Sequence, residues 1–379
     1  MTPDRERIHI DTLVALTGQP GWRRNPAEQA AGLEHLERAL TAAARLEDDV
    51  RLVRMEALLG WHRQDEDALR RALDRAAKTG DERVRAFAEL DYGGYLGQVG
   101  RYESSLRHIV RGIEVLGARG ETSAQGYEMA SSGRCYSARA GRLAAALDYA
   151  ARARELGDRL DDPRLRAWRA AEAEPYMYKG LWEDAVRVAE ENLPHCWEIR
   201  EWGPAFWVSG WAAIAALKLG RRDVARRLLE RALPECEALG ASQVWGMVWL
   251  QMGLAQLSLV LGDKSAALGA ARRAADLAEK SHFRLEQGAA FRVLGQSYEA
   301  AGDASAADAA FRRSLDVLEA IQSRPELGQT LLAYGRFRLT TDRAAGRALI
   351  EHALELFEAM EASGWIAEAR RALASSAPS

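Results

Sequence analysis

FRVLGQSYEAAGDASAADAAF, residues 291–311, is the stretch that decides the fold. Its apolar side chains recur three or four positions apart in each half: Leu294, Tyr298 and Ala301, then Ala307, Ala310 and Phe311. This spacing is typical of amphipathic helices. Gly302 separates the two halves, and glycine tolerates the backbone angles of a tight turn. The stretch therefore predicts two helices joined by a short turn.

The turn glycine returns at near-even intervals through the chain. It stands at Gly60, Gly100, Gly141, Gly180, Gly220, Gly262 and Gly302, in steps of 39 to 42 residues. Such a period indicates an internal repeat. One hairpin cannot bury its apolar face alone, whereas stacked neighbours share a continuous core. We therefore predict an all-α solenoid of about eight helical hairpins, at roughly 45–80, 81–120, 121–160, 161–200, 201–240, 241–281, 282–323 and 324–362.

The repeat sets the predicted domain organisation. Residues 1–26 are expected to be an N-terminal segment and loop. Residues 27–373 form the solenoid with its terminal caps, which include an amphipathic helix at 27–46 and a short final helix at 365–373. Residues 374–379 are expected to be a disordered tail.

Composition narrows the class of protein. Of the 379 residues, 48% are hydrophobic and 28% are charged, which is typical of globular chains. A net charge of −3 gives no electrostatic basis for nucleic-acid binding. The N-terminus leads into no long apolar run, and no stretch is expected to reach the ~18 uncharged apolar residues of a membrane span. Three widely spaced cysteines argue against a disulfide framework. We therefore expect a soluble, cytoplasmic protein.

Small residues stand at fixed distances from the turn glycines. Seven residues before them stand Gly93, Ala173, Ala213, Ala255 and Gly295, with Arg134 the exception. Five residues after them stand Ser105, Ala146, Ala185, Ala225, Ala267 and Ala307. Larger side chains at these points would push the helix axes apart. In the third hairpin Gly133 would fit the pattern better than Arg134, which indicates one extra residue there.

The sequence Leu-Gly at 294–295, then Tyr298, Gly302, Ala307 and Phe311, resembles a tetratricopeptide repeat. The resemblance covers about residues 45–362 and implies a right-handed superhelix whose first helices line a concave groove. The period exceeds the family's ~34 residues. The chain therefore resembles the long-repeat variety of this family, which is found in the sensor region of the bacterial maltose-regulon activator. A HEAT-type array is the alternative, and Pro175 inside a first helix would suit it.

Signatures of catalysis are absent from the sequence. It has no phosphate-binding loop, no His-Glu-x-x-His and no Cys-x-x-Cys. The glycine-rich run at 92–97 follows no strand, so we interpret it as a point of close packing. His195 and Cys196 point roughly 100° apart on a helix and rarely share a metal ion. We therefore predict no catalytic residue, no metal and no cofactor, and a protein that is not an enzyme.

Tryptophans cluster in the middle of the chain. Six of the 11 fall between residues 197 and 249. By the resemblance, the groove would be lined by Glu174, Met177, Tyr178, Trp207, Ile214, Trp249, Met252, Gln256, Arg292, Gln296 and Glu299. Trp211 and Trp245 join this set because each stands four residues from Trp207 or Trp249 on the same helix face. An apolar centre with a polar rim suits recognition of a peptide or flat ligand. The alternative is that these rings are core, because tryptophan is large and packs well.

The sequence favours a scaffold or adaptor that binds a partner protein or peptide in its concave groove. The alternative is a sensor module for a small molecule or peptide pheromone that regulates a partner protein. Neither nucleic acid nor membrane is an expected partner, and the oligomeric state is left open.

Overall fold

The computed structural model describes residues 3–17, 26–240, 244–281 and 283–375. The described residues contain helices and turns but no β-strand, which confirms the all-α prediction. The helices are α1 (Pro3–Thr17), α2 (Pro26–Arg45), α3 (Asp49–Arg63), α4 (Glu66–Thr79), α5 (Glu82–Gln98), α6 (Tyr102–Ala118), α7 (Thr122–Glu128), η2 (Met129–Gly133), α8 (Arg134–Arg139), α9 (Leu143–Leu160), α10 (Pro163–Trp168), η3 (Arg169–Glu172), α11 (Ala173–Lys179), α12 (Trp182–Glu198), α13 (Trp202–Lys218), α14 (Arg222–Leu239), α15 (Val244–Leu261), α16 (Lys264–Glu279), α17 (Arg284–Ala301), α18 (Ala304–Ile321), α19 (Arg324–Arg338), α20 (Arg343–Ala359) and α21 (Ser363–Ser375).

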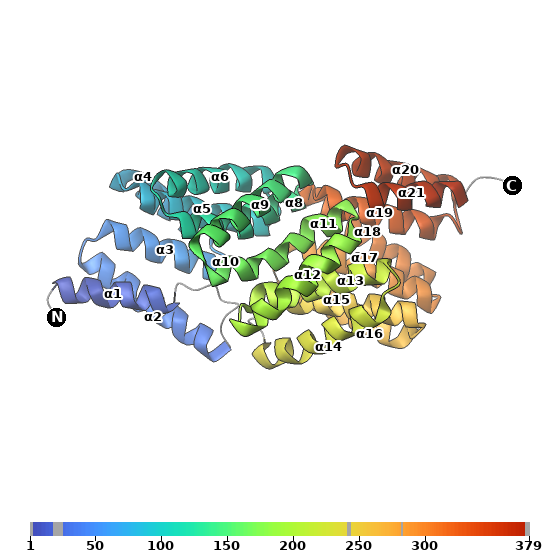
Figure 1. Ribbon diagram of the computed structural model, residues 1–379, viewed down its shortest axis with the longest axis horizontal. Helices are drawn as coiled ribbons and strands as arrows, with labels where there is room; N and C mark the ends of the chain where they lie inside the picture. The colour runs from blue at the N-terminus through green and yellow to red at the C-terminus, as the bar shows by residue number, and fades with distance from the viewer. Residues whose placement is uncertain (1–2, 18–25, 241–243, 282, 376–379) are drawn as a thin grey trace.

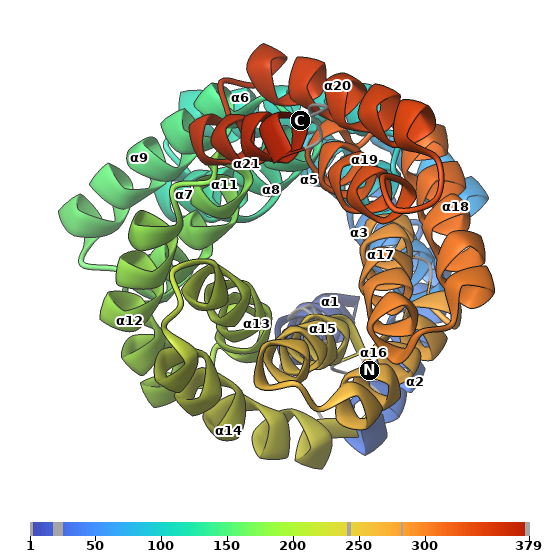
Figure 2. The same ribbon diagram turned by 90° about the vertical axis from the view of Figure 1, so that its right-hand side faces the viewer.

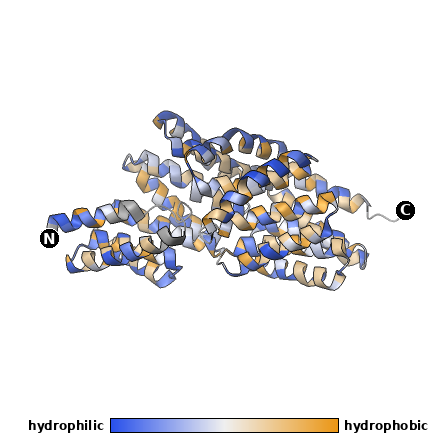
Figure 3. Cartoon of the chain, turned by 90° about the horizontal axis from the view of Figure 1, so that it is seen from below, coloured by the Kyte–Doolittle hydropathy of each residue, from blue (hydrophilic) through white to orange (hydrophobic). Residues whose placement is uncertain are grey.

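From α3 to α20 these helices pair into eight hairpins, within the predicted ranges. The hairpins stack into a right-handed superhelix (Figure 1). Seen along its axis, first helices such as α13, α15, α17 and α19 lie inside, and second helices such as α14, α16, α18 and α20 lie outside (Figure 2). Apolar residues of both layers form one core cluster that runs from α5 to α21. Hydrophilic and hydrophobic residues alternate along the helices, as expected of amphipathic helices (Figure 3).

Six of the seven repeat glycines make the predicted turn. Gly100, Gly141, Gly180, Gly220, Gly262 and Gly302 have φ between 72° and 88°, a region that favours glycine. The prediction for Gly60 is wrong, because α3 continues to Arg63 and Gln64 makes the turn at φ 55°. A Cβ at Gly60 would lie 3.0 Å from the Leu69 side chain, so this glycine permits close packing of α3 on α4.

Two first helices are irregular. The extra residue predicted in the third hairpin is confirmed, because η2 is a π-helical turn between α7 and α8 and holds one more residue than an α-turn. In the fourth hairpin the 3₁₀ turn η3 precedes Pro175, which lacks the N–H that an α-helix would use.

The superhelix closes on itself after one turn. Ser323, before α19, donates a hydrogen bond of 2.9 Å to the carbonyl of Arg139 at the end of α8. The Trp365 indole of α21 donates one of 3.0 Å to the carbonyl of Met177 in α11. These contacts join residues 184 and 188 positions apart. The predicted final helix is therefore confirmed as α21, and it packs against an earlier turn.

One described helix, α15, has the length and apolar character of a membrane span. Its 18 residues have a mean hydropathy of 1.5, so the expectation that no such stretch exists is wrong. The reason lies in packing, since 61% of the helix is buried, between α13 and α17. A helix that is apolar on all sides is typical of a protein core.

The structure describes a helix at each end of the chain, α1 and α21. Residues 3–17 form α1, a helix that the sequence pattern did not predict. Residues 18–25 of the expected N-terminal segment and loop, and residues 376–379 of the expected tail, lie outside the described residues, whereas residues 374–375 lie in α21. The domain bounds themselves stay a prediction.

Candidate functional site

The predicted site residues all lie on inner helices α11, α13, α15 and α17. Seven of them are at most 3% exposed: Glu174, Met177, Tyr178, Trp207, Trp211, Trp249 and Met252. Another five are half-buried: Ile214, Trp245, Gln256, Arg292 and Gln296. Glu299 is exposed. Most of the set is therefore core, as in the alternative that the sequence left open, and a binding role for it stays a prediction.

The tryptophans pack on one another along the inside of the superhelix. Ring centroids lie 4.3 Å apart for Trp207 and Trp245, 5.5 Å for Trp211 and Trp249, and 5.8 Å for Trp168 and Trp207. Rings at these distances gain both apolar burial and favourable aromatic geometry. Trp207, Trp211 and Trp249 are each at most 2% exposed, so their rings contact mainly the protein itself.

A buried network of charged side chains crosses the superhelix beside the tryptophans. Arg134 donates a hydrogen bond of 2.6 Å to Glu174, and Arg139 donates one of 3.1 Å to the other oxygen of that carboxylate. Arg139 also forms an ion pair of 3.1 Å with Glu286 of α17. Trp245 donates a hydrogen bond of 2.6 Å to Glu286. The sequence pattern missed both arginines: Arg134 pairs with the neighbouring hairpin, whereas Arg139 reaches Glu286 only across a superhelical turn.

A cavity with a volume of about 700 Å³ lies in the N-terminal half of the superhelix. Its walls come from α3, α5, α7 to α8 and α10. Of the predicted site residues, it is lined only by Trp207 and Trp245. The volume is within the ~300–1,000 Å³ of typical ligand pockets. The structure therefore moves the candidate site from hairpins four to six toward hairpins one to four.

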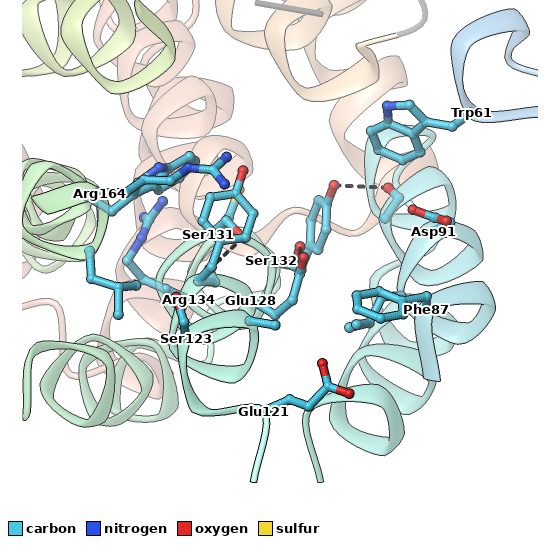
Figure 4. Close-up of a pocket in the computed structure, with 18 of the residues that line it drawn as sticks. Trp61, Phe87, Asp91, Glu121, Ser123, Glu128, Ser131, Ser132, Arg134 and Arg164 are labelled. Carbon is cyan, nitrogen blue, oxygen red and sulfur yellow. Dashed lines mark hydrogen bonds between the residues drawn. The ribbon is translucent and has the colours of Figure 1, made fainter. Parts of the chain in front are cut away.

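One wall of the cavity combines aromatic rings with an ion pair. Figure 4 shows Trp61, Phe87 and Asp91 on the same side. Arg54 donates a hydrogen bond of 3.0 Å to Asp91, and its guanidinium lies 4.9 Å from the centre of the Phe87 ring. Burial raises the pKa of Asp91, and the charge of Arg54 opposes that rise.

Glycines on α5 shape the same wall. A Cβ on Gly94 would lie 2.9 Å from the Trp61 ring. A Cβ on Gly97 would lie 2.3 Å from the Tyr136 ring, whose hydroxyl donates a hydrogen bond of 2.9 Å to the Gly94 carbonyl. The run at 92–97 is thus a point of close packing, as predicted. It was also the one signal in the sequence that marked this wall.

The opposite wall carries Arg164, Tyr127 and Trp168. The guanidinium carbon of Arg164 lies 3.9 Å from the centre of the Tyr127 ring, a stacked cation–π contact. Trp168 donates a hydrogen bond of 3.2 Å to the fully buried Glu201. The Nε of Arg164 lies 3.7 Å from the other oxygen of Glu201. This wall therefore combines aromatic faces with a guanidinium group.

Glu128 lies between the two walls, at the end of α7 (Figure 4). Ser132 donates a hydrogen bond of 2.8 Å to its carboxylate. Burial raises the pKa of Glu128 to about 7, with a further rise from the charge of Asp91 and opposing effects from Ser132, Arg164 and Arg54. A carboxylate in such surroundings favours a ligand that brings its own positive charge.

The cavity can bind and orient a ligand through aromatic faces, hydroxyls and both signs of charge. No group of three or more His, Cys, Asp or Glu side chains in the described part of the chain is arranged to hold a metal ion. The three cysteines are buried, and burial raises the pKa of each thiol to about 12. The arrangement therefore fits recognition of a ligand through non-covalent contacts.

No protein-family model matches the chain, and no curated protein matches its sequence. Solved structures match its fold. A Rap protein in complex with the competence and sporulation factor has a TM-score of 0.61 at 14% identity, with 99% of this chain and 98% of the other covered. The Rap conjugation gene regulator of plasmid pLS20 in complex with the Phr* peptide has a TM-score of 0.60 at 11% identity, covering 95% and 96%.

NprR in complex with its cognate peptide NprX also matches, with a TM-score of 0.55 at 14% identity, covering 86% of this chain and 97% of the other. The structural neighbours are tetratricopeptide-like helical repeat proteins. The chain therefore shares the fold of tetratricopeptide-like solenoids.

Proposed function

We propose that the chain is a binding protein whose cavity holds a short peptide or an extended segment of a partner protein. The observation that carries this proposal is the cavity of about 700 Å³ on the concave side, with aromatic faces and polar groups of both signs on its walls. A cavity of this kind buries apolar side chains while its polar groups fix their orientation. Three fold neighbours hold a peptide or a factor in their solved complexes, which supports the same class of ligand.

A sensor that regulates a partner protein is the second candidate. One observation favours it: Arg134 and Trp245 line the cavity and also belong to the buried network that joins α8 to α17. A ligand that contacts these side chains would change the free energy of the closed turn, and with it the surface offered to a partner. The closer likeness to the sensor region of the maltose-regulon activator remains a hypothesis within this candidate.

The proposal extends to the class of protein and to its location in the cell. A binding role is not an enzymatic one, and we propose a regulatory or adaptor protein. We also propose a cytoplasmic location, where the free thiols of Cys135, Cys196 and Cys236 would stay reduced.

Blocking the cavity tests the binding role. Purified protein is used to select peptides from a random library, and selected peptides are titrated by calorimetry. Ser131 lines the cavity, so Ser131→Trp should fill it and abolish binding. Ser305 is exposed on α18, so Ser305→Trp is the matched control and should bind normally. Equal binding by both variants, or no selected peptide at all, would rule out this cavity as the site.

Two tryptophans separate the cavity from the core. Trp207 lines the cavity, whereas Trp249 is 1% exposed and lies outside its lining. Trp207→Ala should weaken binding of a selected peptide by at least ~2 kcal/mol, in addition to a loss of stability, because its ring is 2% exposed. Trp249→Ala should lower the free energy of unfolding by about 3–5 kcal/mol. Weakened binding in Trp249→Ala without loss of stability would place the recognition surface deeper in the superhelix than we infer.

A further inference from the structure

Most charged side chains that line the cavity already have a partner of opposite charge or a capping role. Asp91 pairs with Arg54 at 3.0 Å, and Glu121 pairs with Arg83 at 2.6 Å. Arg134 pairs with Glu174 at 2.6 Å. The Asp162 carboxylate caps α10 by accepting from the backbone N–H of Arg164 at 2.9 Å and of Leu165 at 3.2 Å. These groups have little capacity left for a ligand's charge.

Among the described residues, Glu128 lacks an ion-pair partner of this kind. Within the part of the chain that the structure describes, no lysine, arginine or histidine nitrogen lies within 4.0 Å of its carboxylate, and its hydrogen bond comes from Ser132. Burial opposes the charged form and raises the pKa of Glu128, and the charges of Arg164 and Arg54 offset that rise only in part. An approaching cation would offset that cost.

Arg164 forms an ion pair with Glu201, but two of its donors make no hydrogen bond within the described part of the chain. Its Nε and Nη2 atoms are buried and have no hydrogen-bond partner among the described residues. The nearest carboxylate oxygen, from Glu201, lies at 3.7 Å, beyond hydrogen-bonding distance. Stacking on Tyr127 holds the guanidinium in place, so its donors are oriented before a ligand arrives. Guanidinium groups bind carboxylates well because two N–H donors match two oxygens.

We propose that Glu128 and Arg164 bind the two opposite charges of one short bipolar peptide, with an ammonium or guanidinium group against Glu128 and a carboxylate against Arg164. Both side chains line the same cavity, on the adjacent helices α7 and α10 (Figure 4). The inference rests on the proposed peptide-binding function and specifies the ligand's charge pattern and its direction in the cavity.

Affinity selection from synthetic peptide mixtures, read by mass spectrometry, tests this assignment. The mixtures are prepared with free ends, acetylated N-termini, amidated C-termini, or both modifications. The wild-type protein should enrich peptides that carry one cation and one carboxylate. The modified mixtures distinguish the α-amino group from Lys or Arg, and the α-carboxylate from Asp or Glu.

Variants assign each charge to its residue. Glu128→Gln should remove the selection for the cation, keep that for the carboxylate, and weaken an enriched peptide roughly tenfold or more. Arg164→Gln should do the reverse, and Arg164→Lys should restore part of the affinity. Glu103→Gln, at an exposed ion pair with Arg142, is the control and should select like the wild type.

Two results overturn the inference, and they differ from each other. If the wild type enriches peptides without a charge pattern, or if Glu128→Gln and Arg164→Gln select like Glu103→Gln, peptides bind but these residues do not read their charges. If the wild type enriches no peptide, the peptide-binding function itself fails and the charge assignment fails with it.

Discussion

Glu286 provides a sharp test of how the closed superhelix is held together. It is 1% exposed, and one of its oxygens accepts hydrogen bonds from Trp245 at 2.6 Å and from Trp249 at 3.3 Å. The same oxygen pairs at 3.1 Å with Arg139, which is 2% exposed. Glu286→Leu would leave a buried guanidinium with less compensation and two indole N–H groups without their acceptor.

The expected loss is large. Removing one member of a buried ion pair costs about 3–5 kcal/mol, and leaving a buried donor unsatisfied adds about 1 kcal/mol or more. We therefore expect Glu286→Leu to lower the free energy of unfolding by about 4–6 kcal/mol, a large share of the ~5–15 kcal/mol of a typical protein. Urea titration followed by circular dichroism and tryptophan fluorescence measures it.

Two further variants make the reasoning refutable. The double variant Arg139→Met with Glu286→Leu removes one charge of each sign and leaves Arg134 paired with Glu174, so it should be more stable than Glu286→Leu alone. Glu279→Leu breaks an exposed pair and should cost less than about 1 kcal/mol. The reasoning is wrong if Glu286→Leu costs no more than Glu279→Leu, or if the double variant is as unstable as the single one.

Three other predictions use the same urea titration. Ala225→Leu should lower the free energy of unfolding by about 1–3 kcal/mol, because residue 225 is 0% exposed. Arg221→Ala, at an exposed ion pair, should change it by no more than about 0.5 kcal/mol, and equal effects of the two variants would contradict the repeat register. Trp365→Ala should lower the free energy of unfolding by about 3–5 kcal/mol without changing peptide affinity, because it removes the hydrogen bond to Met177 that joins the two superhelical turns. An unchanged free energy of unfolding would show that this contact adds no stability. Because the folded-state pKa of Glu128, about 7, exceeds its ordinary 4.5, the wild type should lose stability as the pH rises from about 4.5 to about 7. Glu128→Gln should lack this loss, so its stability relative to the wild type should be greatest near pH 8. Parallel curves of stability against pH for the two proteins would refute this prediction.

Local chemistry explains why so much of the fold was predictable. The 3.6-residue periodicity, the turn glycines and the small residues at fixed offsets act within one hairpin or between neighbours. These contacts determine eight hairpins, the α21 cap and the extra residue that becomes η2. The prediction for Gly60 was wrong because the sequence does not distinguish a helical glycine that allows close packing of Leu69 from a glycine that makes a turn.

The candidate site depended on a different scale of contact. The sequence located a tryptophan cluster, but whether an inner face is open or filled depends on how far the superhelix curves. That curvature is the sum of small rotations over many repeats, and it brings Arg139 to Glu286 and Met177 to Trp365 across one turn. The sequence by itself determined the repeating hairpin and its core; only the tertiary structure decided that the tryptophans would be buried and that the cavity would lie between α5, α7 and α10, because contacts across a superhelical turn have no signature within one repeat.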